Sequence, residues 1–308
     1  MSLTLPERLS HLPKSQRCEL ERVARILFEE FAEAQKGKLS DKKKRGRILK
    51  LVLFGPLARH DWVRERRSNH RCGYDLLVVV STRTFANPNN GWNQAAERFL
   101  LELTITKHLA TPVNFLVHSI MDLNDQLALG RPFFLDIVRD GIMLYETPGF
   151  ALAKPKPLNP ALAKAEMRRH LYHWLPGAAH RLELAKAAIG RGYDKEAVFD
   201  LHQVTERLYH CALHVLTLYS PKSHRLTFLR IHAERVAPRL LEVWPNDSRF
   251  ARQCFARLDR AYVDARYSCH YEITGDELAW LVERIEVLQE TVAAICAAHL
   301  NDVNCAET

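Results

Sequence analysis

The chain has 308 residues, which is enough for two domains of ordinary size. With 47% hydrophobic and 26% charged residues it has the composition of a soluble globular protein, and no apolar run approaches the ~20 residues that a membrane span needs. The seven cysteines are scattered without Cys-x-x-Cys spacing, and the start of the chain lacks the pattern of a secretion signal. These features favour a cytoplasmic protein with reduced thiols and disfavour a cysteine zinc site. The net charge of +8 favours polyanionic partners such as nucleotides or RNA.

The first predicted element is an amphipathic helix, because apolar residues recur at helical spacing between residues 15 and 35. A basic run at residues 36–47 follows it and is either a solvated loop or a phosphate-attracting rim beside a site. The apolar run Ile48–Phe54 is predicted as the first strand of a sheet.

The residues after that strand predict a tight turn that opens a helix. Gly55 permits the turn and a close backbone approach to phosphate. Pro56 lacks an N–H donor but is well placed at the first position of a helix. The backbone amides from Leu57 onward remain to point at an anion, and Arg59 either reaches a phosphate or pairs with a surface carboxylate.

A second apolar run, 73–80, carries one carboxylate, Asp75, near its start and is predicted as the second strand. A polar and strongly basic stretch at residues 60–72 suits a loop between the two strands. Residues 91–109 predict a helix, and residues 112–118 predict a third strand whose polar residue is Asn114.

The arrangement resembles the nucleotidyltransferase fold of the DNA polymerase beta type. The resemblance rests on the first strand, the turn at Gly55, the helix that it opens, and the second strand with Asp75. The resemblance implies a turn that cradles a triphosphate and two carboxylates, at i and i+2 of the next strand, that hold magnesium between them. Asp75 matches the second carboxylate, but Gly73 stands where the first is expected. The family's serine hydroxyl is likewise replaced by Pro56, and a third carboxylate that often lies on the following strand is replaced by Asn114.

The resemblance therefore implies a domain that binds a nucleotide such as ATP better than it transfers it. The nucleotide-binding candidates are Gly55, Pro56, Leu57, Arg59, Asp75 and Asn114. Asp75 is also the candidate catalytic residue and the candidate magnesium ligand, if the transferase site is active. The stretch from Pro132 to Glu146 resembles the helix, Gly and apolar strand that close the family's domain.

Four prolines between residues 147 and 160 predict a semi-rigid linker, and helical patterns follow to the end of the chain. Breaks near Gly190, Pro221, Pro245 and Gly275 predict about five helices in an up-and-down bundle.

The helical part resembles the HEPN domain (higher eukaryotes and prokaryotes nucleotide-binding). The resemblance rests on the helix with Leu201–Leu208, on Lys222-Ser-His224 before the next helix, and on the Ala-Arg-Tyr turn that begins at Ala265. Some HEPN domains are metal-independent ribonucleases that pair an arginine with a histidine in a dimer, with four to six residues between the two. Arg266 and His270 are the matching catalytic candidates, although only three residues separate them. The Ala-Arg-Tyr pattern is closer to the branch associated with nucleotide binding, and His224 is expected at a helix start.

The sequence thus predicts an α+β nucleotidyltransferase domain (1–147), a proline-rich linker (148–160) and an all-α HEPN bundle (161–308). The favoured function is a nucleotide-binding protein with a degenerate transferase domain, a regulator of the toxin–antitoxin or defence type that acts on RNA. The alternative is an active enzyme, either a magnesium-dependent nucleotidyltransferase that transfers AMP or a HEPN ribonuclease. We expect no membrane partner, and we expect a homodimer that forms through the HEPN bundle.

Overall fold

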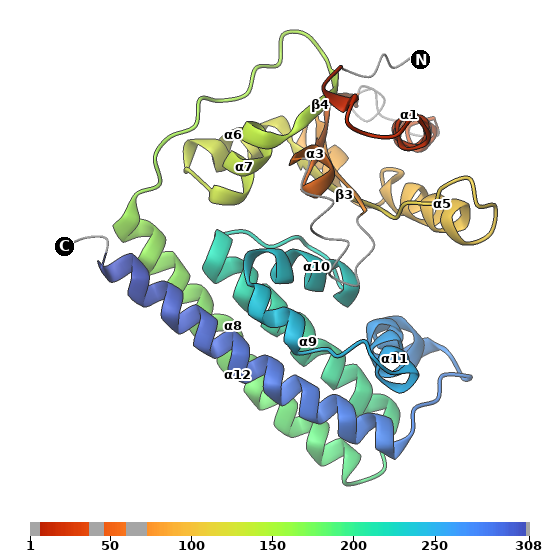
Figure 1. Cartoon of the computed structure of the whole chain (residues 1–308), viewed down its shortest axis with the longest axis vertical. Helices are drawn as coiled ribbons and strands as arrows, with labels where there is room; N and C mark the ends of the chain where they lie inside the picture. The colour runs from red at the N-terminus through yellow and green to blue at the C-terminus, as the bar shows by residue number, and fades with distance from the viewer. Residues whose placement is uncertain (1–6, 37–45, 60–72, 306–308) are drawn as a thin grey trace. The chain divides into compact units, whose positions relative to one another are not determined.

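The computed structural model describes residues 7–36, 46–59 and 73–305, so most of the two basic runs lies outside the described residues. The chain divides into two compact units, Met1–Leu158 and Asn159–Thr308. The first contains a small mixed sheet with helices, and the second is built from helices (Figure 1). The predicted α+β character of the N-terminal part and the helical character of the C-terminal part are therefore confirmed.

The sheet of the N-terminal unit has the strand order β3-β2-β1-β4. Its strands are β1 (Ile48–Phe54), β2 (Tyr74–Val80), β3 (Val113–Ser119) and β4 (Ile142–Glu146). Strand β1 is antiparallel to β2 and β4, whereas β2 and β3 are parallel. The register places Phe54, Asp75 and Asn114 side by side across three strands. Asp75 therefore lies at the end of the sheet where β1 turns into the next helix.

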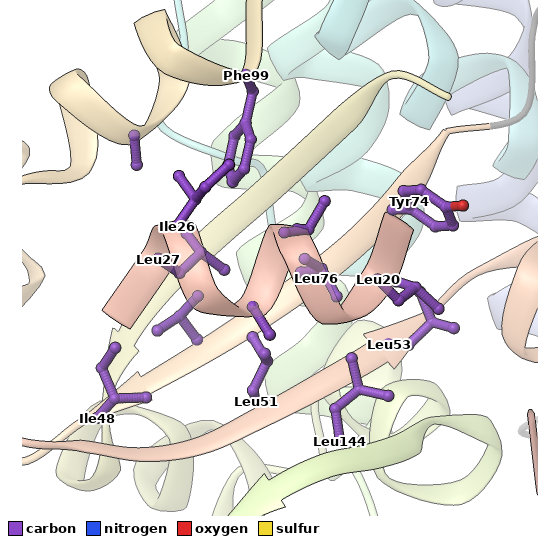
Figure 2. Close-up of a cluster of buried hydrophobic side chains, with 14 of the residues drawn as sticks. Leu20, Ile26, Leu27, Ile48, Leu51, Leu53, Tyr74, Leu76, Phe99 and Leu144 are labelled. Carbon is purple, nitrogen blue, oxygen red and sulfur yellow. The ribbon is translucent and has the colours of Figure 1, made fainter. Parts of the chain in front are cut away.

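Helices α1 (Lys14–Glu33) and α5 (Trp92–Thr104) bury one face of the sheet. Figure 2 shows α1 lying across the strands, with Leu20 and Leu27 packed among side chains from β1, β2 and β4. Helix α1 supplies one apolar face, and every second residue of the strands supplies the face that it covers, although β1 and β2 are buried on both faces. Burying these apolar faces is the main stabilising term. Alternation places Asp75 on the opposite face of β2 from Tyr74 and Leu76, which belong to this core.

Shorter elements complete the N-terminal unit. They are the 3₁₀ helices η1 (Glu7–Leu9) and η2 (Arg83–Ala86) and the α-helices α3 (Pro56–Arg59), α6 (Ile120–Ala128) and α7 (Pro132–Asp140). Helix α7 contacts β1, and α6 contacts β2 and β3. The side chain of Lys50 is 1% exposed and pairs with Glu146 on the neighbouring strand, so this buried ammonium is matched by a carboxylate.

The C-terminal unit contains five α-helices and one 3₁₀ helix within the described residues. They are α8 (Pro160–Ile189), α9 (Asp194–Thr217), α10 (Leu226–Val236), η3 (Pro238–Glu242), α11 (Arg249–Tyr267) and α12 (Gly275–Cys305). Helix α8 ends before Gly190 and α12 begins at Gly275, as the predicted breaks indicated, whereas the ends of α10 at Val236 and of α11 at Tyr267 were not predicted. No helix among the described residues has the length and apolarity needed to cross a bilayer.

Helix α9 is the centre of this bundle, since it packs against α8, α10, α11 and α12. Its predicted apolar stripe is fully buried and consists of Leu201, Val204, Leu208, Ala212 and Val215. Because helices surround α9, polar side chains on its other faces are buried as well. The most consequential of these are His202, Glu206 and His210.

Candidate functional site

The turn after β1 has the tight geometry that the sequence predicted. Gly55 has a φ of 75°, which is a left-handed conformation that glycine adopts without steric cost. Pro56 is the first residue of α3. The amides of Ala58 and Arg59 donate to the Gly55 carbonyl at 3.1 and 3.2 Å. Two of the amides that were candidates for anion binding are therefore used inside the turn itself.

Arg59 lies close to a carboxylate of the same unit. Its Nη1 atom is 3.9 Å from Oδ2 of Asp140, at the end of α7. The pKa of Asp140 is lowered, first by its hydrogen bonds from Arg139 and also by the charge of Arg59. This contact matches the surface-carboxylate pairing that was one of the two roles expected for Arg59, and the phosphate role stays a prediction.

The Asp75 carboxylate is buried, with only 1% of the residue exposed. The side-chain amide of Asn114 donates a hydrogen bond to its Oδ1 atom at 3.2 Å. These two candidates were assigned to the same site from sequence, and the parallel pairing of β2 and β3 brings them together. An amide in this position holds the carboxylate in place but cannot accept a proton from an attacking hydroxyl.

Gly73 has no room for the carboxylate that the transferase resemblance implies. A Cβ atom at this position would lie 2.9 Å from the backbone oxygen of Pro112 and 3.2 Å from the amide nitrogen of Asn114. Magnesium needs several oxygen ligands in near-octahedral geometry, and two-metal chemistry needs carboxylates that bridge the ions. No group of three His, Cys, Asp or Glu side chains suited to a metal occurs among the described residues. The described donors around Asp75 therefore do not by themselves hold a magnesium pair.

A second candidate site lies in the helical unit, where a pocket of about 780 Å³ opens between the start of α9 and the end of α11. Its lining residues are Lys195, Glu196, Phe199, Asp200, Ala265, Arg266, Tyr267, Ser268 and Cys269. The Lys195 ammonium donates to the Ser268 carbonyl at 3.0 Å, and Asp200 is paired with Arg181 of α8. The pocket thus combines positive charge, an aromatic wall and carboxylates that can accept hydrogen bonds.

Arg266 is surrounded by aromatic rings at this pocket. Its guanidinium carbon lies 4.4 Å from the ring centre of Tyr262, 5.0 Å from that of Tyr267 and 5.1 Å from that of Phe199. Its Nε atom also donates to the Tyr262 carbonyl at 2.7 Å. Cation–π contacts and this bond hold the guanidinium in place while the residue stays exposed. A fixed, accessible guanidinium is suited to a phosphate or to the face of a nucleobase.

His270 lies outside α11, in the turn that follows Ser268, and its side chain is exposed. It is not among the residues that line the pocket with Arg266. Its backbone amide lies 3.3 Å from the Ser268 hydroxyl, which holds the turn. The helix-end geometry expected for this stretch is therefore present, and it removes the shared helix face that would align the two catalytic candidates.

A buried carboxylate beside this region was not predicted. Glu206 on α9 accepts hydrogen bonds from His224 Nδ1 at 3.1 and 3.2 Å and from the Gln203 amide at 3.0 Å. His202 and His210, one turn before and one turn after it, lie 3.7 and 3.8 Å from its oxygens. The spacing of four residues from His202 to Glu206 and on to His210 was the signal in the sequence that these side chains share a face. His224 does not cap a helix, since α10 begins two residues later.

The two buried histidines have strongly shifted pKa values. Burial lowers the pKa of His202 to about 4, in spite of the nearby charge of Asp259, which raises it. Burial also lowers the pKa of His210 to about 4, with help from the charges of His224 and Arg207. His202 donates from Nε2 to the His224 carbonyl at 3.0 Å, and His210 Nδ1 lies 2.6 Å from the Ser220 hydroxyl. Both are thus neutral side chains that fix the loop carrying His224.

Comparison with known families agrees with the helical part of this description. The family model of the HEPN domain matches residues 171–295, which include the pocket and the Glu206 cluster. The C-terminal unit therefore contains a HEPN domain. No curated protein matches the chain at a significant level. The family comparison gives no support for a nucleotidyltransferase domain in the N-terminal unit.

Proposed function

We propose that this protein binds nucleotides and single-stranded RNA through its HEPN unit and acts as a regulator of the toxin–antitoxin or defence type. The observation that carries the proposal is the exposed Arg266 guanidinium, held by three aromatic rings at the mouth of the pocket. Stacking and positive charge together are the common means of binding unpaired nucleotides. The net charge of +8 supports a polyanionic partner.

We also propose that the N-terminal unit is a degenerate nucleotidyltransferase. Three observations support this part: the single buried Asp75, the crowded position of Gly73, and the turn amides that donate to Gly55. Such a site can retain contacts with a nucleotide while lacking the carboxylates that align two metals.

A homodimer through the HEPN bundle belongs to the same proposal and is supported by large apolar side chains that stay exposed on α8, namely Leu162, Tyr172 and Leu184.

Calorimetric titration with AMP tests the HEPN site. The Arg266→Ala variant should weaken AMP binding by about tenfold, which is the size of one partly desolvated cation–π contact. The matched control is Arg260→Ala, because Arg260 is exposed on the same helix and also donates from Nε to the carbonyl four residues earlier. Equal affinity in the two variants, or no binding by the native protein, would contradict the proposal.

Incubation with magnesium, labelled ATP and total RNA tests the enzymatic alternatives in the same preparation. The native protein is expected to transfer no AMP and to leave the RNA intact. AMP transfer that disappears in Asp75→Asn would show an active transferase. RNA cleavage that disappears in His270→Ala would show a HEPN ribonuclease.

A further inference from the structure

Three side chains from different parts of the HEPN unit form a continuous stack. The His224 imidazole lies parallel to the Tyr262 ring, with ring centres 4.2 Å apart and planes 7° apart. The Arg266 guanidinium lies 4.4 Å from the centre of the same ring. Two groups cannot occupy one face of a ring at these distances without overlapping, so Arg266 and His224 cover opposite faces of Tyr262. The pocket lies on the Arg266 side of this stack, because Arg266 and Phe199 line it.

The other end of the stack is open to solvent. The His224 side chain is 58% exposed although one of its faces is covered by Tyr262. Most of that exposure must therefore come from its second face and its outer edge. The stack ends in an aromatic surface of the right size and shape for one more planar group.

The imidazole at this end is fixed in position. Its Nδ1 atom carries the hydrogen that the two Glu206 oxygens accept, and the Glu206 side chain is only 12% exposed. The Gln203 amide holds the carboxylate, and the hydrogen bond from His202 Nε2 to the His224 carbonyl holds the loop. An exposed ring that is held in this way loses little conformational entropy when a ligand stacks on it.

The charges on either side of His224 indicate the kind of ligand. Lys222 and Arg225 are both exposed, and Arg266 lies beyond Tyr262. Cations that flank a ring stack are typical of sites for single-stranded nucleic acid, where the rings take bases and the cations follow the phosphates. A free anion would leave the open ring face unused.

We propose that the exposed face of His224 is a nucleobase-stacking subsite, so that the ligand of the HEPN unit is a strand of unpaired RNA that reaches past the pocket rather than a single nucleotide. This inference rests on the proposed function, because the pocket at Arg266 holds the neighbouring nucleotide. Glu206 acts as a positioning residue, since it orients the imidazole without contacting the strand.

The test compares two probes on the same full-length variants: AMP by calorimetry, and a labelled single-stranded RNA of about 12 nucleotides by fluorescence anisotropy. His224→Ala should weaken RNA binding by roughly 5- to 100-fold, the range for losing one stacked base, and should leave AMP binding unchanged. His224→Phe should restore most of the RNA affinity, because it keeps a ring for stacking. His180→Ala, at an exposed histidine of α8, is the control and should bind both probes like the native protein.

The outcomes separate this inference from the proposed function. If the native protein binds AMP and RNA but His224→Ala binds RNA equally well, the subsite is disproved and the Arg266 site stands. If a folded His224→Phe binds RNA no better than His224→Ala, stacking is also disproved. If the native protein binds neither probe, the proposed function fails and the subsite fails with it.

Discussion

At the scale of single residues, His202 and His210 are the side chains whose chemistry the fold changes most. Both would titrate near pH 6.5 in the unfolded chain, but burial lowers their pKa values to about 4 in the bundle. Between these two pKa values, both histidines are protonated in the unfolded chain and neutral in the folded bundle. The stabilisation that these two neutral histidines contribute is fully present above pH 6.5, and it is lost as the pH falls from there toward 4.

The helical unit should accordingly unfold more easily in mild acid. Between pH 7.5 and 5.5 each of the two histidines should remove roughly 1 kcal/mol from the free energy of unfolding. Urea titrations of the helical unit at both pH values measure this loss. His202→Gln and His210→Gln should each reduce the difference, whereas His180→Gln, at an exposed position, should not. A pH effect that survives in the double variant would show that other groups cause it.

Asp75 and Asn114 illustrate how much of a site can be assigned from residue identity alone. The sequence showed Gly73 at the position where the transferase resemblance implies a partner carboxylate. What the sequence did not show is that Asp75 is buried and bonded to the Asn114 amide, because burial and side-chain contacts depend on strand pairing.

At the scale of elements, the start of β2 bears on the proposed degeneracy of the N-terminal unit. The transferase resemblance implies a carboxylate two residues before Asp75, which is the position of Gly73. Here that position packs against the backbone of Pro112, just before β3. The pairing of β2 with β3 therefore crowds the position at which the resemblance implies a carboxylate.

Gly73→Asp should therefore destabilise the N-terminal unit without giving AMP transfer. The new Cβ would meet a backbone oxygen at 2.9 Å, so β2 or β3 must shift, at a cost of about 1–3 kcal/mol. Thermal unfolding and the labelled-ATP assay measure the two effects. Gly275→Asp serves as the control, because a Cβ there meets nothing within 4 Å and an acidic residue suits the first turn of α12. Magnesium-dependent AMP transfer by Gly73→Asp would refute this account.

Helices α9 and α11 show the same dependence on packing. Periodicity predicted α9 with its buried face, and helical pattern between predicted breaks indicated a helix in the region of α11. Which turns of the two helices face each other, and so place Phe199 beside Arg266, is not encoded in either period. The pocket between them could not be predicted for that reason.

At the scale of the whole molecule, the chain consists of two units that each bury their own core. The division falls between Leu158 and Asn159, inside the proline-containing segment. Leu76 of β2 and Leu208 of α9 are both fully buried, one in each unit. Units with separate cores are expected to unfold in separate steps.

Truncating a core side chain should therefore destabilise only the unit that contains it. Leu76→Ala should lower the unfolding transition of the sheet unit, and Leu208→Ala that of the helical unit, each by about 2–5 kcal/mol. Denaturant unfolding followed by circular dichroism, with each variant compared to the native protein, measures the two transitions. A single transition that both variants shift equally would mean that the units unfold cooperatively.

The sequence by itself determined the main elements and their order, and it predicted a degenerate N-terminal site. Periodicity, glycine and proline positions, and the presence or absence of a carboxylate are local properties that a linear chain displays directly. The tertiary structure alone decided which side chains meet: Arg266 with Phe199, His224 with Glu206, and Asp75 with the Asn114 amide. Those pairs join residues that are far apart in the chain, and their contacts exist only because burial of the apolar faces fixes how strands and helices are rotated against one another.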